Sequence, residues 1–197
     1  MLFRSVGIPG QFGASYIGLR ALLQAAGVPE SEIQLDSIGF NQVEALATGQ
    51  EDAVVVYVNN EPLQLEAQGI PVRVLRVSDY VQLASNGIIT SEATLDESPD
   101  LVRRFLEAVD RGLRDTLADP MAAYEISKAY VEGLEAVDSD VQRRVLETSI
   151  SFWRAEQLGR SDPGAWENMV EVLISMDLLD ESPDVSQAFS NEYLPGQ

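Results

Sequence analysis

The sequence predicts an α/β fold for the first part of the chain and a mainly helical second part. Strand-like and helix-like segments alternate as far as residue 77, which is typical of α/β proteins. From Ser98 onward, nearly every segment has the apolar spacing of a helix. The composition, with 45% hydrophobic and 23% charged residues, is that of an ordinary globular protein. We therefore expect one large or two small domains in 197 residues.

Local signals place the elements of the α/β part. A short strand runs through Val6-Gly7-Ile8 to Pro9-Gly10, and a helix follows that ends at Gly27, the usual residue of a helix C-cap. Asn41 begins a second helix and has Glu44 three residues later, which is the spacing of a capping box. Further strands are expected at 33–38, 52–58 and 72–77, with a short helix over 61–68.

Proline marks the helix starts of the second part. After an extended run at 87–90, Ser98-Pro99 predicts a helix that Ser98 caps, because proline fits the first turn. Asp119-Pro120 predicts a second helix through Tyr130, and Asp162-Pro163 predicts a helix that ends near Met176. Another helix is expected between these two, over 138–156.

Composition excludes several classes of function. There are 13 Lys and Arg against 32 Asp and Glu, a formal charge of −19, so nucleic acid and anionic membrane surfaces are poor partners. Without His or Cys, the chain has no imidazole or thiolate ligand, no disulfide and no Ser-His-Asp triad. Nothing in the sequence indicates a cofactor or a metal.

No apolar run is long enough to span a membrane, and no signal-peptide pattern begins the chain. Either the protein is cytoplasmic or its natural N-terminus lies outside this chain.

Two polar segments are candidates for ligand contact. The Gly-rich turn over 7–15 joins a strand to a helix, where free N–H groups can hold a ligand, but a tight structural turn is the favoured interpretation. Its glycine spacing matches neither the P-loop nor the dinucleotide fingerprint. Asn59-Asn60-Glu61-Pro62 follows the strand at 52–58, and ligands of open α/β sheets bind at such carboxyl ends. Asn60 is equally suited to cap the next helix, and capping and ligand contact are compatible.

Aromatic residues are candidates for stacking on a flat ligand, although most aromatic residues at helical spacing belong to the core. For Trp166 the core is the favoured location. The other candidates are Tyr57, Tyr80, Trp153 and Tyr193.

Several segments together resemble a known family, the substrate-binding proteins of ABC importers. They are Val6-Gly7-Ile8-Pro9-Gly10-Gln11-Phe12-Gly13-Ala14-Ser15-Tyr16, Glu44-Ala45-Leu46, Gly49-Gln50-Glu51-Asp52-Ala53, Asn59-Asn60-Glu61-Pro62 and Asn191-Glu192-Tyr193-Leu194-Pro195. The chain is most similar to the branch of thiamine-pyrimidine-precursor binders and pyrimidine synthases. This resemblance implies a periplasmic-binding-protein-like (type II) fold, in which two α/β lobes flank a cleft, and an N-terminally shortened chain. Residues 1–78 would then form the complete second lobe with a mixed sheet, and 79–197 the crossover and the helical C-terminal part of the first lobe.

The same resemblance implies a site and a function. The loop of Gly10, Gln11, Phe12, Gly13, Ala14 and Ser15 would line the cleft, with Tyr57, Asn59, Asn60 and Glu61 at the next strand end and Trp153 as a stacking face. A carboxylate such as Glu61 can pair with the ring nitrogen and amino group of an aminoheterocycle.

The implied function is non-enzymatic, extracytoplasmic capture of a thiamine pyrimidine precursor or riboflavin-type heterocycle for an ABC permease and its ATPase. Two alternatives remain, a ligand-sensing domain and a pyrimidine-synthase-like enzyme, although the synthase branch depends on a His and a Cys-rich motif that this chain lacks. We also expect the apolar helix faces of the second part to be partly exposed or covered by another copy.

Overall fold

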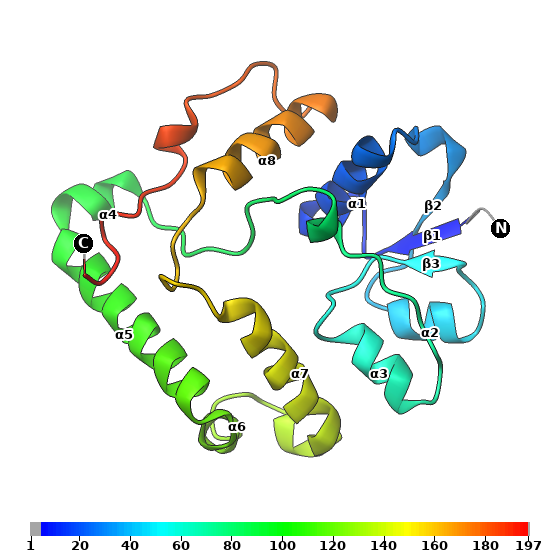
Figure 1. Cartoon of the computed structure of the whole chain (residues 1–197), viewed down its shortest axis with the longest axis horizontal. Helices are drawn as coiled ribbons and strands as arrows, with labels where there is room; N and C mark the ends of the chain where they lie inside the picture. The colour runs from blue at the N-terminus through cyan, green and yellow to red at the C-terminus, as the bar shows by residue number, and fades with distance from the viewer. Residues whose placement is uncertain (1–4, 197) are drawn as a thin grey trace. The chain divides into compact units, whose positions relative to one another are not determined.

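A computed structural model describes residues 5–196, which divide into two compact units (Figure 1). Unit 1 comprises residues 1–85 and 162–185, and unit 2 comprises residues 86–161 and 186–197. Both units are therefore built from two separate stretches of the chain. The assignment of 1–78 and 79–197 to two lobes stays a prediction.

Unit 1 contains a small parallel sheet. The central strand β1 (Ser5–Ile8) pairs with β2 (Gln34–Ser37) on one side and with β3 (Ala53–Val54) on the other. The α/β class is thus confirmed, but the expected mixed sheet is wrong for the described strands, which all pair in parallel. The reason is that a helix lies between each strand and the next, and helical crossovers return the chain in the same direction.

Two of the predicted strands differ from the structure. The strand expected at 52–58 is limited to β3, after which Val55 N donates one more bond to Gly7 O at 2.9 Å. The segment 72–77 forms no strand, because no described segment pairs with it, and Val74 and Leu75 are exposed. An alternating pattern gives a segment one apolar face, but a strand also needs an adjacent strand to pair with its backbone N–H and C=O groups.

Helices cover both faces of this sheet (Figure 1). α1 (Gly13–Ala26) lies on one face, where Val6 and Ile8 of β1 pack against Leu19. α2 (Gln42–Ala47) and α3 (Glu61–Ala67) lie on the other face. The predicted C-cap is confirmed, because Gly27 has a left-handed φ of 64° and Val28 N bonds to Leu23 O. The predicted capping box is wrong, because Asn41 Nδ2 donates back to Ile38 O at 3.0 Å and makes no bond into the helix.

The second stretch of unit 1 is fixed to α1. It contains α8 (Pro163–Ser175), whose last residue bonds through Oγ to Gln24 Oε1 at 2.9 Å. Arg20 donates to the Tyr16 hydroxyl at 3.1 Å and lies 3.2 Å from Glu30 Oε2. The bond to Tyr16, followed by the charge of Glu30, raises the pKa of Arg20. The bond between Ser175 and Gln24 joins α8 to α1 within unit 1.

The described part of unit 2 is helical. Its helices are α4 (Glu92–Glu97), α5 (Pro99–Ala118), α6 (Pro120–Ser127) and α7 (Ser139–Trp153). Short 3-10 turns lie at Glu30–Glu32, Val77–Asp79, Leu134–Ala136 and Val185–Gln187 along the whole chain. The three proline helix starts are confirmed, although α6 and α7 end three residues earlier than predicted. Ser98 occupies the cap position without a side-chain bond, whereas Asp119 Oδ1 accepts from Ala122 N.

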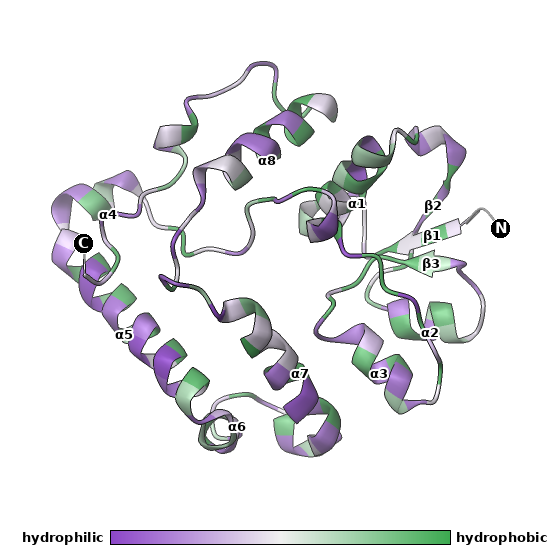
Figure 2. Cartoon of the chain, viewed as in Figure 1, coloured by the Kyte–Doolittle hydropathy of each residue, from purple (hydrophilic) through white to green (hydrophobic). Residues whose placement is uncertain are grey.

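Much apolar surface of unit 2 is exposed, as expected from the sequence. No residue of α5 is buried, although hydrophobic and hydrophilic residues alternate along it (Figure 2). Leu101 and Phe105 of this helix are exposed, and so is Tyr130. Among the described residues, none of the helices combines the length and the apolar character needed to cross a membrane.

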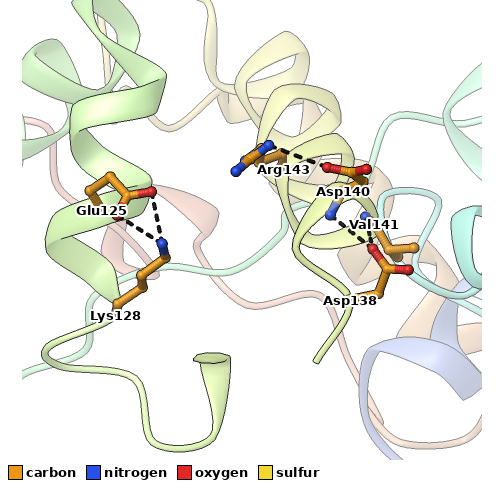
Figure 3. A network of polar contacts seen from close by, with 6 residues as sticks. All are labelled: Glu125, Lys128, Asp138, Asp140, Val141 and Arg143. Carbon is orange, nitrogen blue, oxygen red and sulfur yellow. Dashed lines mark hydrogen bonds and ion pairs between the residues drawn. The ribbon is translucent and has the colours of Figure 1, made fainter. Parts of the chain in front are cut away.

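A polar network holds the region between α6 and α7 (Figure 3). Lys128 Nζ donates to both oxygens of Glu125 at 2.8 Å, and Asp138 accepts from the backbone N–H groups of Asp140 and Val141. Lys128 and Arg143 both lie over the ring of the buried Tyr124. A hollow of about 430 Å³ over residues 128–136 belongs to this connection.

Candidate functional site

The candidate site is the edge of unit 1 where the three parallel strands end. Parallel strands bring their carboxyl ends to the same edge, so the loops that follow β1, β2 and β3 meet there. Each loop carries an aromatic side chain that is largely exposed, namely Phe12 at 69%, Phe40 at 87% and Tyr57 at 53%. This edge therefore offers aromatic faces to a flat ligand.

The loop after β1 is shaped by glycine. A Cβ atom on Gly10 would lie 2.2 Å from Cε1 of Phe12, so the ring occupies the space that a side chain at position 10 would need. Gly13 has a φ of 65°, which is the left-handed conformation that glycine adopts without strain. These two glycines place the Phe12 ring over the turn and begin α1.

The loop after β2 is held against the end of β1. Ile38 N donates to Ile8 O at 2.9 Å, and the Asn41 side chain bonds back to Ile38 O. Phe40 lies between these two anchored residues and points to solvent. α2 begins directly afterwards with Gln42, which is only 5% exposed.

The loop after β3 is closed by Glu61. The backbone N–H of Tyr57 donates to Glu61 Oε2 at 3.1 Å, and Asn60 N donates to Tyr57 O at 3.0 Å. Asn60 precedes α3 but does not cap it, because its Oδ1 accepts from Gln64 Nε2 at 2.9 Å. The capping interpretation of the Asn60 side chain is therefore wrong, and Glu61 stabilises the turn.

A groove of about 580 Å³ lies between α2 and α3, which are neighbours in unit 1 (Figure 1). Its lining contains five carboxamides, two carboxylates and no Lys or Arg. The lining residues are Phe40, Asn41, Gln42, Val43, Glu44, Ala47, Thr48, Asn60, Glu61, Gln64 and Gln68. Such a lining suits a neutral or cationic ligand that offers several hydrogen bonds, because carboxylates repel anions.

The structure brings only some of the predicted site residues to this groove. Asn60 and Glu61 line it, whereas the loop 10–15, Tyr57 and Asn59 lie on the same edge without lining it. Contact of any of these residues with a ligand stays a prediction.

The remaining aromatic candidates lie elsewhere. Tyr80 follows the turn at Val77–Asp79 and is exposed, and Trp166 is half-buried in α8 of unit 1. Trp153 is the last residue of α7 in unit 2 and is 39% exposed. Tyr193 lies in unit 2, with Arg103 over its ring. A stacking role for Trp153 stays a prediction.

Sequence reasoning missed the other nine lining residues, among them Phe40, Asn41 and Gln42 at the start of the groove's α2 side. A signal was present for these three, because they follow the strand at 33–38 in the same way that Asn59 and Asn60 follow the strand at 52–58. The rule that ligands bind at carboxyl ends of strands applies to both loops. The spacing of Asn41 and Glu44 also fits a capping box, and that pattern hides the position of Asn41 after a strand end.

Comparison with known proteins finds a matching family and relatives that are named as binding proteins or as pyrimidine synthases. The family described as NMT1/THI5 like matches residues 4–123. The riboflavin-binding protein RibY of Chloroflexus aurantiacus is 40% identical over 98% of this chain and 56% of that protein. A formylaminopyrimidine-binding protein of Halalkalibacterium halodurans is 24% identical over 88% of the chain and 54% of its own length. A 4-amino-5-hydroxymethyl-2-methylpyrimidine phosphate synthase of Legionella pneumophila is 25% identical over 98% and 60%. The chain thus spans somewhat more than half the length of these relatives.

Proposed function

Because the chain belongs to the NMT1/THI5-like family, we propose that it captures a small, flat, uncharged heterocycle as the solute-binding component of an ABC importer. The observation that carries this proposal is the carboxyl edge of the unit 1 sheet, where three exposed aromatic side chains accompany a groove rich in carboxamides. Aromatic faces stack on flat rings, and carboxamides both donate and accept hydrogen bonds. Together they match the chemistry of an aminopyrimidine or a flavin ring.

Two relatives favour binding over catalysis. One is named for riboflavin and the other for formylaminopyrimidine, and both are binding proteins. We propose that this chain also captures a heterocycle of that kind. It would do so outside the cytoplasm and deliver the heterocycle to a permease with its ATPase. Trp153 and the loop from Gly10 to Ser15 remain part of the proposed ligand-binding set.

The second candidate function is pyrimidine synthesis, which the names of two relatives favour. This chain has no His and no Cys, so any acid, base or nucleophile would have to come from carboxylates, hydroxyl groups or its single lysine. The groove offers Glu44 and Glu61 for such a role. Binding without turnover accounts for the site with fewer assumptions, and we place synthesis second.

Isothermal titration calorimetry of the 197-residue chain tests the proposal. The ligands are riboflavin, formylaminopyrimidine and 4-amino-5-hydroxymethyl-2-methylpyrimidine. We expect saturable heat with at least one of them and recovery of that ligand unchanged after incubation. Absence of heat with all three would refute the proposed ligand class, and conversion of the ligand would favour the synthase.

Glu61 provides the sharpest single-residue test of the site. In Glu61→Ala, loss of the bond from Tyr57 N should lower the unfolding free energy by about 1 kcal/mol, because the bond is solvent-exposed. Loss of a charge-assisted bond to ligand should weaken binding about tenfold or more. Glu61→Gln retains an oxygen for Tyr57 N, so it should keep its stability and lose affinity.

Glu32→Gln is the matched control, because this exposed carboxylate lies in the same unit but outside the groove. It should change neither stability nor affinity. If Glu61→Gln bound the ligand as well as the wild type does, the Glu61 carboxylate would act in the loop alone.

A further inference from the structure

Phe40 belongs to both parts of the candidate site. It is one of the three exposed aromatic residues at the carboxyl edge of the sheet, and it is the only aromatic residue among the described residues that line the groove. Bonds at Ile38 and Asn41 hold the loop on either side of it, yet the ring itself is 87% exposed. A ligand that lies on this ring therefore reaches the aromatic edge and the groove together.

The aromatic edge is wider than a single six-membered ring. In the sheet, β1 lies between β2 and β3, and neighbouring strands are about 4.8 Å apart. The strands that lead to Phe40 and Tyr57 are therefore separated by about 10 Å, and the strand that leads to Phe12 lies between them. A single pyrimidine ring cannot cover that width, whereas several fused rings can stack on more than one of these side chains.

The groove runs away from this edge. α2 follows β2 and α3 follows β3, so both helices start at the carboxyl edge and lead back along the sheet. α2 has six residues and, at a rise of 1.5 Å per residue, is about 9 Å long. Asn60 and Glu61 line the groove near the edge, and Thr48 and Gln68 line its far end. A flexible chain attached to a ring system on Phe40 has room to extend between the two helices.

The lining of the groove suits a chain of hydroxyl groups. Each of its five carboxamides has an oxygen that accepts and an NH₂ that donates, and a hydroxyl group can pair with either. Glu44 and Glu61 add acceptors, and among the described lining residues no Lys or Arg is present to pair with an anion. Gln64 Nε2 already donates to Asn60 Oδ1, whereas Gln68 is exposed. The groove therefore suits an uncharged polyhydroxyl chain better than an apolar or a phosphorylated one.

We propose that the site takes a ligand of two parts, a fused multi-ring heterocycle on the aromatic edge and an uncharged polyhydroxyl chain in the groove, with Phe40 at their junction. This inference rests on the proposed function and narrows its ligand class. Four compounds separate the parts. Riboflavin has both, lumiflavin has a methyl group in place of the chain, flavin mononucleotide has a phosphate at the end of the chain, and 4-amino-5-hydroxymethyl-2-methylpyrimidine has a single ring.

Calorimetry of the 197-residue chain with these four compounds tests both parts. Riboflavin should bind about tenfold more tightly than lumiflavin, because only riboflavin can form hydrogen bonds along the groove. It should also bind about tenfold more tightly than flavin mononucleotide, because the carboxylates repel the phosphate. The pyrimidine should bind more weakly than lumiflavin, because one ring leaves most of the aromatic edge uncovered.

Substitutions in the groove should affect the chain alone. Gln64→Leu and Gln68→Leu remove hydrogen-bonding groups, so each should weaken riboflavin binding severalfold and leave the affinity for lumiflavin within about twofold of the wild type. Gln50→Leu is the matched control, because Gln50 is exposed and lies outside the groove. It should change the affinity for neither flavin.

Substitution of Phe40 should affect both flavins. Phe40→Leu removes the aromatic face and should weaken riboflavin and lumiflavin by about tenfold, whereas Phe40→Trp keeps an aromatic face and should bind both. The melting temperature should not change in Phe40→Leu, because the ring is largely exposed. Tyr130→Leu is the matched control, since Tyr130 is a largely exposed aromatic residue of unit 2, and it should leave both affinities unchanged.

The outcomes that contradict the inference differ from those that contradict the proposed function. Equal affinity for riboflavin and lumiflavin, or tighter binding of flavin mononucleotide, would overturn the polyhydroxyl chain in the groove. A pyrimidine that binds more tightly than both flavins would overturn the fused rings and leave the proposed function standing. Unchanged affinity in Phe40→Leu would remove Phe40 from the junction. Failure of the wild type to bind any of the heterocycles would instead refute the proposed function.

Discussion

Gly7 lies where the sheet meets the α2 side of unit 1, and adding one methyl group there tests the packing beneath the groove. A Cβ atom at this position would lie 2.6 Å from Ile38 Cδ1 and 3.0 Å from Glu51 Cγ. Carbon atoms in contact are normally separated by about 3.5 to 4.0 Å. In Gly7→Ala, Ile38 and Glu51 must therefore move, and Ile38 anchors the loop that carries Phe40.

The expected magnitude comes from two opposing effects. Overpacking a closed site destabilises a protein by about 1 to 3 kcal/mol. Replacing glycine by alanine restricts the unfolded chain and recovers about 0.4 to 1 kcal/mol. The midpoints of these two ranges, about 2 and about 0.7 kcal/mol, differ by about 1.3 kcal/mol, so we expect Gly7→Ala to lower the unfolding free energy of unit 1 by roughly that amount.

Urea unfolding followed by tryptophan fluorescence measures this change for each unit separately. The chain has two tryptophans, Trp166 in unit 1 and Trp153 in unit 2. A Trp153→Phe background leaves Trp166 to report on unit 1, and Trp166→Phe leaves Trp153 to report on unit 2. This separation is needed because a protein of two units does not have to unfold in one step.

Gly112→Ala is the matched control, because it makes the same chemical change in α5 with no atom within 4 Å of the new Cβ. It should stabilise unit 2 by about 0.5 to 1 kcal/mol, since glycine is a poor helix residue. An unchanged or higher unfolding free energy for Gly7→Ala would refute the close packing of Gly7 against Ile38 and Glu51.

Two further substitutions test the core and a helix cap. Ile8→Ala removes three carbons from a fully buried side chain. Urea unfolding should show that the unfolding free energy of unit 1 falls by about 3 to 4 kcal/mol, because apolar transfer energy is lost and a cavity is left. A loss below about 1 kcal/mol would show that the core around Ile8 is not tightly packed. Asp138→Ala removes the carboxylate that accepts from Asp140 N and Val141 N at the start of α7. Unfolding followed by Trp153 fluorescence should show a loss of about 1 kcal/mol in stability. Unchanged stability would mean that water replaces the helix cap without cost.

The predictions that succeeded depend on a few neighbouring residues. Gly27, Asp119-Pro120 and Asp162-Pro163 fix helix ends through their own backbone geometry and side chains, so their effect can be recognised without the rest of the fold. The strand expected at 72–77 failed because strand formation needs a partner that the pattern itself does not contain. Asn41 failed as a cap because its side chain had a competing acceptor, Ile38 O.

The sequence predicts only the part of the candidate site that directly follows one recognisable strand. Asn60 and Glu61 were found because they directly follow a strong apolar run, and both line the groove. The parallel pairing of β2 with β1 brings Phe40 to the same edge, and that pairing is a property of the topology. The burial of Gln42 could not be predicted, because it depends on how α2 lies against the sheet and α3.

The return of residues 162–185 to unit 1 has a consequence for the order in which the protein folds. Ser175 and Gln24, which bond to each other, are separated by 151 positions along the chain. Contacts so distant in sequence require closure of a long loop before they stabilise anything, and such contacts slow folding. A ribosome must also finish α8 before α1 can receive its last partner. During translation, the segment up to residue 85 is therefore complete while one side of α1 is still uncovered. A chaperone that binds apolar helix faces could bind α1 at that stage.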